Sequence, residues 1–379
     1  MAQGISSTLY YFLLDFKRNK TDSIKTSPTL QGGATAHFWQ IIFAENFKTM
    51  KYTKLILPAI MLWLTVSGCQ KEHLINEDGN LVPKTVDQDA SIPSISINGT
   101  QLHAETFGNP DSPMLVILHG GPGADYRYLL NCKEFADYGY YVVFYDQRGS
   151  GLSKRESKDS YSIQTMFDDL SAVIAHYKTS SNQKVILLGH SWGAMLATAY
   201  INENPTAITG AILGEPGGFK WQDVIDYVSR TKNYGITSET LNDATYLDQF
   251  ITGNEDEQAI LDYKLSLLAY SDGASDSPLG NEGVLPFWRS GAIVNRALFE
   301  LGEKEQPDWT TNLQSFTTKV LFCYSERNQA YGLEHAQKVS SAYPDVDLER
   351  INDGGHDFIT FPDGWNNFFP IALNYLNTL

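Results

Sequence analysis

The sequence predicts an α/β protein with a doubly wound, mostly parallel sheet and a helical cap inserted after the sixth strand. Two observations lead to this fold class. Short, continuously apolar runs alternate with a segment of helical spacing, and the alternation stops for about a hundred residues after Glu215. Continuous apolar runs are typical of parallel strands that are covered on both faces, and the order strand, helix, strand favours right-handed crossovers between them.

The expected elements begin with a hairpin, because Asn98-Gly99 separates two alternating runs within residues 94–108. Apolar residues at a spacing near 3.6 predict a helix over residues 166–177. The remaining runs predict strands at residues 113–120, 140–146, 184–189, 208–215 and 318–324, and a more polar last strand at residues 346–351. The core is therefore expected over residues 94–215 and 318–379, with the helical cap over residues 216–317 between them.

The chain before residue 94 is expected to be a targeting region. A basic opening at Met50 precedes an apolar run, residues 55–66, that is too short to span a membrane, and Cys69 follows directly. Residues 50–68 resemble a bacterial lipoprotein signal, which implies lipidation of Cys69; the alternative is an ordinary signal peptide with a coincidental cysteine. Residues 69–93 then form a polar tether, and residues 1–49 are interpreted as a mis-assigned start. The expected location is the bacterial cell envelope, on the periplasmic or cell-surface side, with membrane contact through the lipid anchor alone.

Charge and cysteine content limit the possible partners. Of 44 acidic and 28 basic residues, residues 1–68 hold 3 and 7, which leaves 41 acidic and 21 basic side chains in the expected mature chain. Such an excess of negative charge repels phosphate backbones and argues against nucleic-acid binding. Cys132 and Cys323 are expected to be buried thiols, although a disulfide is possible in an oxidising compartment. The spacing of cysteine and histidine indicates no metal site, so no metal and no cofactor are expected.

Ser191 is the candidate nucleophile. It lies in Gly189-His190-Ser191-Trp192-Gly193, between an apolar strand and a segment of good helix formers. Gly-x-Ser-x-Gly at a strand-to-helix turn is the nucleophile elbow, which exposes the serine hydroxyl above the sheet edge. The competing interpretation is an ordinary glycine-rich turn with a solvated serine.

Two further loops complete the candidate site. His119-Gly-Gly-Pro-Gly123 follows a buried strand, and glycine permits the close backbone approach that an oxyanion donor needs, so the N–H groups of Gly121 and Trp192 are the expected donors. His356 follows the last strand and is the expected general base, because serine, acid, histidine is the chain order of hydrolases that carry this elbow.

These motifs together resemble the proline iminopeptidase group of the α/β-hydrolase superfamily, over residues 95–379. The resemblance rests on His119-Gly-Gly-Pro-Gly123, on the Asp146-Gln-Arg-Gly-Ser-Gly151 loop and on Ser191-Trp192-Gly193. It implies a cofactor-free serine hydrolase that releases N-terminal residues from short peptides. Asp146 and Arg148 are expected to hold neighbouring loops in place. One departure is His190, where the group more often has glycine and where other hydrolases, including esterases, carry histidine.

The acid of the triad is the second departure. Asn328 stands where the group usually has an aspartate, and an amide is a poor substitute for that carboxylate. Glu215, at the end of the sixth strand, is the preferred candidate, because related capped hydrolases carry their acid at that strand end. Glu326 is the alternative. Glu215 itself is open to two other interpretations, as a cap hinge or as a recognition group for a substrate amine.

The expected activity is that of an aminopeptidase acting on a short-peptide or small-molecule substrate, with a carboxylester, lactone or amide hydrolase as the alternative. Epoxide hydrolase chemistry is disfavoured, because it needs a carboxylate nucleophile where this chain has Ser191. A weakly active surface-binding protein is the rival from another class, since Asn328 replaces the usual acid. The sequence leaves the oligomeric state open.

Overall fold

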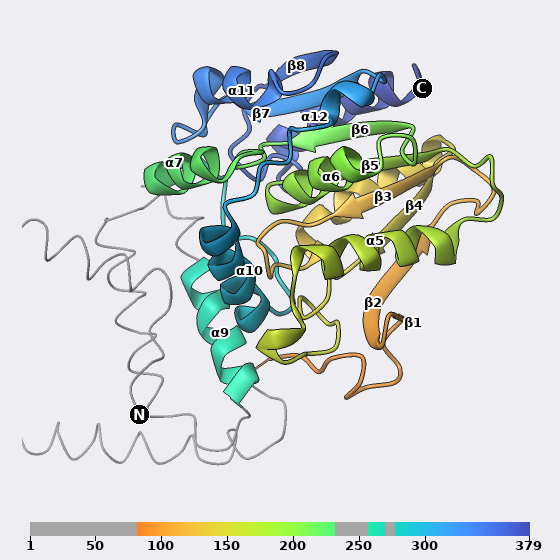
Figure 1. Ribbon diagram of the computed structural model, residues 1–379, viewed down its shortest axis with the longest axis vertical. Coiled ribbons are helices and arrows are strands. Elements are labelled where there is room, and N and C mark those ends of the chain that lie inside the picture. Colours follow the sequence, from red (N-terminus) through yellow and green to blue (C-terminus); the bar gives the residue numbers. More distant parts are fainter. Residues whose placement is uncertain (1–81, 232–256, 270–276) are drawn as a thin grey trace, which may run out of the picture. The chain divides into compact units, whose positions relative to one another are not determined.

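The computed structural model describes residues 82–231, 257–269 and 277–379, and these fold around one eight-stranded sheet (Figure 1). The strand order is β1-β2-β4-β3-β5-β6-β7-β8. β1 pairs antiparallel with β2 and β2 with β4, whereas all later neighbours are parallel. The strands are β1 (Ser94–Ile97), β2 (Thr100–Phe107), β3 (Met114–Leu118), β4 (Tyr141–Tyr145), β5 (Val185–His190), β6 (Gly210–Gly214), β7 (Val320–Ser325) and β8 (Val346–Ile351). The predicted doubly wound, mostly parallel sheet is confirmed.

The first turn has the geometry that its sequence predicts. Ile97 pairs with Thr100, so Asn98 and Gly99 form a two-residue hairpin loop. Both have positive φ, 45° at Asn98 and 75° at Gly99. Asparagine and glycine are the residues that adopt this left-handed conformation most readily, which fixes the register of the hairpin.

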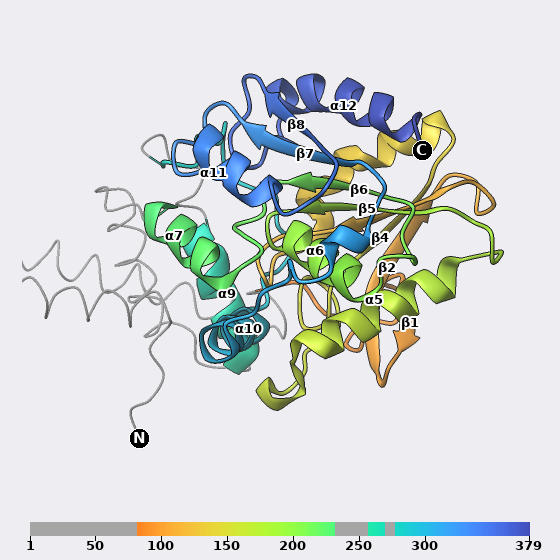
Figure 2. The ribbon, with the colours of Figure 1, turned by 45° about the horizontal axis from the view of Figure 1, so that its top comes forward.

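Helices cover both faces of the sheet, and the alternation of side chains along each strand divides the core in two (Figure 2). Met114, Val116 and Leu118 face one layer, while Leu115 and Ile117 face the other. The first layer contains α5 (Ile163–Tyr177), α6 (Trp192–Glu203) and α11 (Gly332–Ser340), and the second contains the 3₁₀ helix η2 (Tyr126–Tyr138) and α12 (Pro362–Leu376). Strands buried on both faces explain the continuously apolar runs of β3 to β7.

The segment between β6 and β7 contains helices joined by loops in its described parts and lies beside one end of the sheet (Figure 1). Its helices are α7 (Trp221–Thr231), α9 (Glu257–Ala269), α10 (Ala292–Glu305) and η5 (Leu313–Ser315). A short η3 (Lys158–Ser160) lies between β4 and α5 and has no buried residue. Asp262 of α9 binds the guanidinium groups of Arg155 and Arg289 at 2.9 and 2.8 Å. This buried cluster joins the inserted segment to the loop after β4.

Residues 82–93, which the sequence assigns to a tether, pack on the domain. Val86 is buried and its N–H donates to the carbonyl of Leu152 at 2.9 Å, and the Pro83 carbonyl accepts from Arg289. The predicted signal, Cys69 and the rest of the tether lie outside the described residues. Cys132 and Cys323 are buried free thiols, as expected. Within the described ranges, no helix is both long enough and apolar enough to cross a bilayer.

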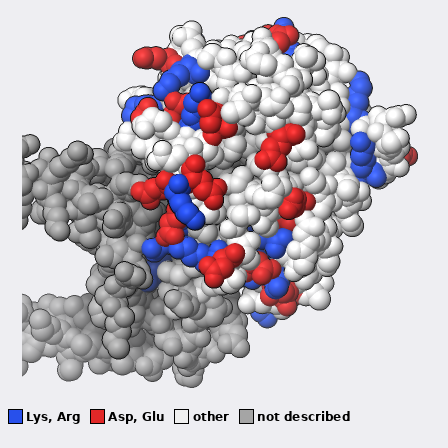
Figure 3. Space-filling model, in the orientation of Figure 1, with Lys and Arg blue, Asp and Glu red and all other residues white. Residues whose placement is uncertain are grey.

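Charged side chains on the surface are mixed in sign. On the face seen in Figure 3, acidic and basic groups lie next to one another. Several form ion pairs between elements, such as Lys338 of α11 with Asp223 of α7 at 2.6 Å. Exposed pairs of this kind contribute little individually, about 0 to 1 kcal/mol.

Candidate active site

Ser191 lies on a tight strand-to-helix turn between β5 and α6. Its backbone has φ 54° and ψ −120°, a sparsely populated conformation for a residue with a side chain. The neighbouring glycines are required by space: a Cβ on Gly189 would lie 2.4 Å from the Gly193 carbonyl oxygen, and one on Gly193 would lie 2.0 Å from that of Leu118. The Gly-x-Ser-x-Gly pattern therefore encodes the observed turn geometry.

Glu215 and His356 form a buried pair at the same edge of the sheet. Nδ1 of His356 lies 2.7 Å from Oε2 of Glu215, whose side chain is completely buried. The Ser191 N–H donates to the carbonyl of Gly214 at 2.8 Å, so Ser191 and Glu215 end adjacent strands. A carboxylate only accepts hydrogen bonds, so His356 carries a proton on Nδ1 and its Nε2 is the nitrogen that can act as a base.

Both carboxylate oxygens of Glu215 are held by protein groups. Oε1 accepts from the N–H and the hydroxyl of Ser325 at 2.6 and 2.7 Å, and Oε2 also accepts from Nδ2 of Asn328 at 2.8 Å. Asn328 is oriented in turn by the backbone N–H groups of Ala330 and Tyr331, which donate to its Oδ1 at 3.2 Å. This buried and fully bonded carboxylate is placed to orient His356 and has no surface for a substrate amine.

Glu326, the alternative acid, lies elsewhere. Its side chain is exposed, accepts from the N–H of Asp353 at 3.0 Å and approaches Arg350 at 3.5 Å. Asn328, rather than Glu326, is the residue of the β7 loop that faces the histidine, with Nδ2 at 3.5 Å from Nδ1 of His356.

The loop with the expected oxyanion donors packs against Ser191. Gly121 has φ 118°, and a Cβ on Gly120 would lie 3.1 Å from that of Ser191. Trp192 is the first residue of α6, where N–H groups have no acceptor within the helix. The Trp192 indole donates to Gln147 at 2.9 Å, and Gln147 bonds both the Nε2 and the carbonyl of His119. Gln147 therefore ties the elbow to the glycine-rich loop.

Asp146 and Arg148 have the architectural roles that the sequence predicts. Asp146 is fully buried and accepts from His103, from the N–H of Tyr126 and from the N–H of Leu152. Arg148 makes a two-pronged ion pair with Asp169 at 2.8 Å. These contacts fix the loop after β4 beneath the candidate site.

The inserted segment contacts both candidate catalytic loops. Tyr227 of α7 places its hydroxyl 3.3 Å from Nδ1 of His356. The His356 N–H donates to the carbonyl of Leu279 at 2.8 Å, and the N–H of Gly291 donates to that of Gly123 at 2.6 Å. The inserted segment is thus part of the framework that holds the histidine loop and the glycine-rich loop.

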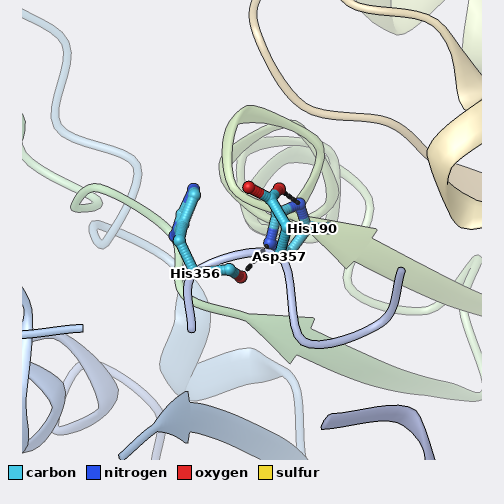
Figure 4. Close-up of side chains that lie close together, drawn as sticks. All are labelled: His190, His356 and Asp357. Atoms are coloured by element: carbon cyan, nitrogen blue, oxygen red, sulfur yellow. Dashed lines mark hydrogen bonds and ion pairs between the residues drawn. The ribbon is translucent and has the colours of Figure 1, made fainter. Parts of the chain in front are cut away.

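His190, Asp357 and His356 lie close together (Figure 4). Such a group resembles a set of metal ligands, but both nitrogens of His190 already have protein partners: Nδ1 lies 2.8 Å from the Tyr128 hydroxyl and Nε2 lies 2.8 Å from the His356 carbonyl oxygen. Burial and the neighbouring His356 hold the pKa of His190 well below its usual value. We therefore assign this group to a hydrogen-bond network.

Several residues of the site were not predicted from the sequence. No local pattern marks Tyr128 or Tyr227, and the motif that contains Gln147 does not reveal its bonds to Trp192 and His119. His190 is buried and hydrogen-bonded through both nitrogens, which its place in the Gly-x-Ser-x-Gly pattern does not reveal. Asp357 is buried beside His356 and bonds Asn281, and only its position next to the histidine could have marked it.

The sheet order, the elbow after β5 and the histidine after β8 define the α/β-hydrolase fold. Comparison with known proteins agrees. The family described as "Serine aminopeptidase, S33" matches residues 110–262. A solved carboxylesterase structure from Nitrososphaera gargenis superposes with a TM-score of 0.54 over 76% of this chain and all of that chain, at 15% identity.

Similar sequences carry different activities in their names. An AB hydrolase superfamily protein of Bacillus subtilis is 38% identical over 112 residues, 29% of this chain and 38% of the relative. Epoxide hydrolase 1 of Caenorhabditis elegans is 32% identical over 130 residues, 33% of this chain and 31% of the relative. A proline iminopeptidase of Pestalotiopsis fici is 25% identical over 274 residues, 69% of this chain and 92% of the relative. The first two matches thus span only about a third of those relatives.

Proposed function

We propose that the protein is a serine hydrolase that works through an acyl-enzyme. The observation that carries this proposal is the buried contact of 2.7 Å between His356 and Glu215, at the sheet edge where the elbow presents Ser191. A base whose second nitrogen is fixed by a buried carboxylate is the arrangement that activates a serine hydroxyl.

In the proposed reaction Ser191 Oγ attacks the substrate carbonyl carbon while its proton passes to Nε2 of His356. The N–H groups of Gly121 and Trp192 stabilise the oxyanion, and His356 returns the proton to the leaving group as the bond breaks. Water, activated by the same histidine, then hydrolyses the acyl-enzyme. Glu215 holds the Nδ1 proton throughout and stabilises the imidazolium.

For the substrate, we propose a short peptide with a free N-terminus, cleaved by aminopeptidase activity of the proline iminopeptidase type. The sequence resemblance over the three motifs and the likeness to the Pestalotiopsis fici proline iminopeptidase support this choice. A carboxylester, lactone or amide hydrolase is the second candidate, favoured by His190 in front of the nucleophile. The serine at position 191 disfavours epoxide opening, despite the likeness to an epoxide hydrolase.

A fluorophosphonate probe, which reacts with activated serines, tests the reaction class. We expect wild-type protein to be labelled on Ser191, and Ser191→Ala and His356→Ala to remain unlabelled. Turnover of proline p-nitroanilide and of p-nitrophenyl acetate then separates the peptidase from the esterase. An unlabelled wild type with no turnover of either substrate would favour the surface-binding protein instead.

We also propose that the protein is anchored in the bacterial cell envelope through lipids on Cys69, facing the periplasm or the cell surface. The basic opening, short apolar run and following cysteine of residues 50–69 support this. More than one acyl chain is expected, because a single chain gives only marginal binding of about 10⁴ M⁻¹. Membrane fractionation of wild type and Cys69→Ala tests it.

A further inference from the structure

A continuous chain of hydrogen bonds connects the glycine-rich loop to the candidate general base. The N–H of Gly120 lies 2.7 Å from the hydroxyl oxygen of Tyr128, which lies 2.8 Å from Nδ1 of His190. Nε2 of His190 lies 2.8 Å from the carbonyl oxygen of His356. All four residues are buried, so water does not compete for these bonds.

The donor and acceptor of every bond in this hydrogen-bond series are fixed by the groups at its two ends. The Gly120 N–H can only donate and the His356 carbonyl can only accept. His190 therefore carries its proton on Nε2. Because burial and His356 hold its pKa well below the usual value, the ring is neutral and Nδ1 is an acceptor. The Tyr128 hydroxyl then accepts from Gly120 and donates to His190.

This series of hydrogen bonds begins and ends at the two parts of the site whose separation matters most for the proposed reaction. Gly120 precedes Gly121, an expected oxyanion donor, and packs against Ser191. His356 is the expected base. Asp357 also faces His190, with Oδ1 3.9 Å from Nδ1, while its other oxygen accepts from Asn281 at 2.5 Å. The ring of Phe287 lies edge-on to that of Tyr128, with centroids 5.7 Å apart.

We propose that Tyr128 and His190 are positioning residues, which hold the oxyanion loop and His356 at a fixed separation. This inference rests on the proposed serine hydrolase function. Neither residue touches the reacting atoms; each acts on the backbone of a loop that does. The role also accounts for a histidine in front of the nucleophile, where a glycine could make no such bridge.

Variants of the two residues test the proposal with the fluorophosphonate probe. Tyr128→Phe removes one oxygen and breaks the chain in the middle. His190→Gln keeps an N–H near the Nε2 position and so retains the bond to His356, whereas His190→Asn is too short to reach that carbonyl. Tyr343→Phe is the matched control, because it removes another buried hydroxyl, which bonds Thr198 at 2.9 Å and takes no part in this hydrogen-bond chain.

The measured quantities are the maximal labelling rate, the probe concentration at half-maximal rate, its pH profile and thermal unfolding. A misplacement of about 1 Å can cost about 10²-fold in rate, so we expect about a 10²-fold lower maximal rate for His190→Asn and about 10-fold for Tyr128→Phe and His190→Gln. The half-saturating concentration and the pH profile should change little, and Tyr343→Phe should label like wild type.

Because Tyr128 and His190 belong to one series of hydrogen bonds, the losses of labelling rate that their substitutions cause should not add. Tyr128→Phe combined with His190→Asn should label no more slowly than His190→Asn alone. Equal rates for wild type, Tyr128→Phe and His190→Asn, or additive losses, would overturn the proposal. So would nitrogen chemical shifts in the wild type that place the His190 proton on Nδ1, a measurement independent of whether any variant folds. If wild type and Ser191→Ala label equally, the proposed function itself fails and the positioning role falls with it.

Discussion

Replacing Glu215 by glutamine should disable the enzyme through the protonation of His356 rather than through the fold. The Ser325 N–H and hydroxyl both point at one carboxylate oxygen, at 2.6 and 2.7 Å. In Glu215→Gln the amide oxygen must stay there to accept these bonds, so the amide nitrogen takes the other position. That nitrogen is a donor and faces Nδ1 of His356.

A donor at that place reverses the tautomer of the histidine. His356 would keep its proton on Nε2, the nitrogen that must accept the Ser191 proton, and a charged imidazolium would lack its carboxylate. The same change in a comparable triad lowers turnover by about 10⁴-fold, so we expect a loss of about 10³- to 10⁴-fold here. The new amide also meets Nδ2 of Asn328, which donated to the carboxylate at 2.8 Å, so some stability is lost as well.

Asn328→Asp provides the second half of the experiment. In the wild type, Nδ2 of Asn328 lies 3.5 Å from Nδ1 of His356, and Oδ1 of Asn328 accepts from two backbone N–H groups. In the double variant Glu215→Gln, Asn328→Asp, the new carboxylate oxygen accepts from the amide of residue 215 and lies near the histidine. A shift of less than 1 Å would complete a normal hydrogen bond, so we expect about a 10-fold recovery of turnover over Glu215→Gln alone.

The assay is turnover of a free-amine peptide substrate and of a neutral ester, together with thermal unfolding of each variant. Both substrates should lose activity equally in Glu215→Gln, because the residue acts on His356. Glu326→Gln is the matched control: the same chemical change, on an exposed carboxylate, should leave turnover unchanged. Wild-type turnover in Glu215→Gln, or a loss confined to the free-amine substrate, would refute our placement of the acid.

Three other outcomes are expected. Ser191→Ala and His356→Ala should each abolish turnover to a similar depth in steady-state assays, because members of a triad act as a unit; substantial activity in Ser191→Ala would contradict this. Burial lowers the pKa of His119 and His190, so the unfolded chain binds protons that the folded chain excludes; the stabilising contribution is full above about pH 6.5 and is lost as the pH falls from there toward the lowered folded-state pKa of each histidine. The free energy of unfolding, measured with urea between pH 5 and 7.5, should depend less steeply on pH in His190→Gln than in the wild type. An unchanged pH dependence would refute a lowered pKa for His190. Finally, Cys69→Ala should release the protein from membranes on fractionation, whereas retention would exclude lipid anchoring.

The fold was predictable because its signals are local. Strands buried on both faces are continuously apolar, the Asn98-Gly99 turn has one favoured conformation, and the elbow needs glycines where a Cβ would lie only 2.0 and 2.4 Å from backbone oxygen atoms. Each of these constraints acts within about ten residues of chain. The packing of residues 82–93 was not predictable, because a polar segment gives no sign of the surface that receives it.

The site was predictable only as far as it lies at strand ends. Ser191, Glu215 and His356 each follow a strand, so the topology alone brings them to one edge of the sheet. Tyr227, by contrast, reaches His356 from a helix of the inserted segment, and Tyr128 reaches His190 from the helix η2. These contacts depend on how helices dock, which no motif or periodicity in the sequence encodes.

The position of the acid follows from the pairing of two neighbouring strands. β6 and β7 run parallel, and the Glu215 N–H donates to the Cys323 carbonyl at 3.0 Å, so both strands end at the same edge beside His356. A carboxylate after either strand can therefore approach the same Nδ1. Asn328, which follows β7, has a role of its own: its amide nitrogen donates to Glu215, and its oxygen accepts from the backbone. A carboxylate at both positions would place two negative charges about as close as a hydrogen bond, which disfavours ionisation of one of them. An amide at position 328 therefore stabilises the ionised carboxylate of Glu215, and the two residues should be tested together.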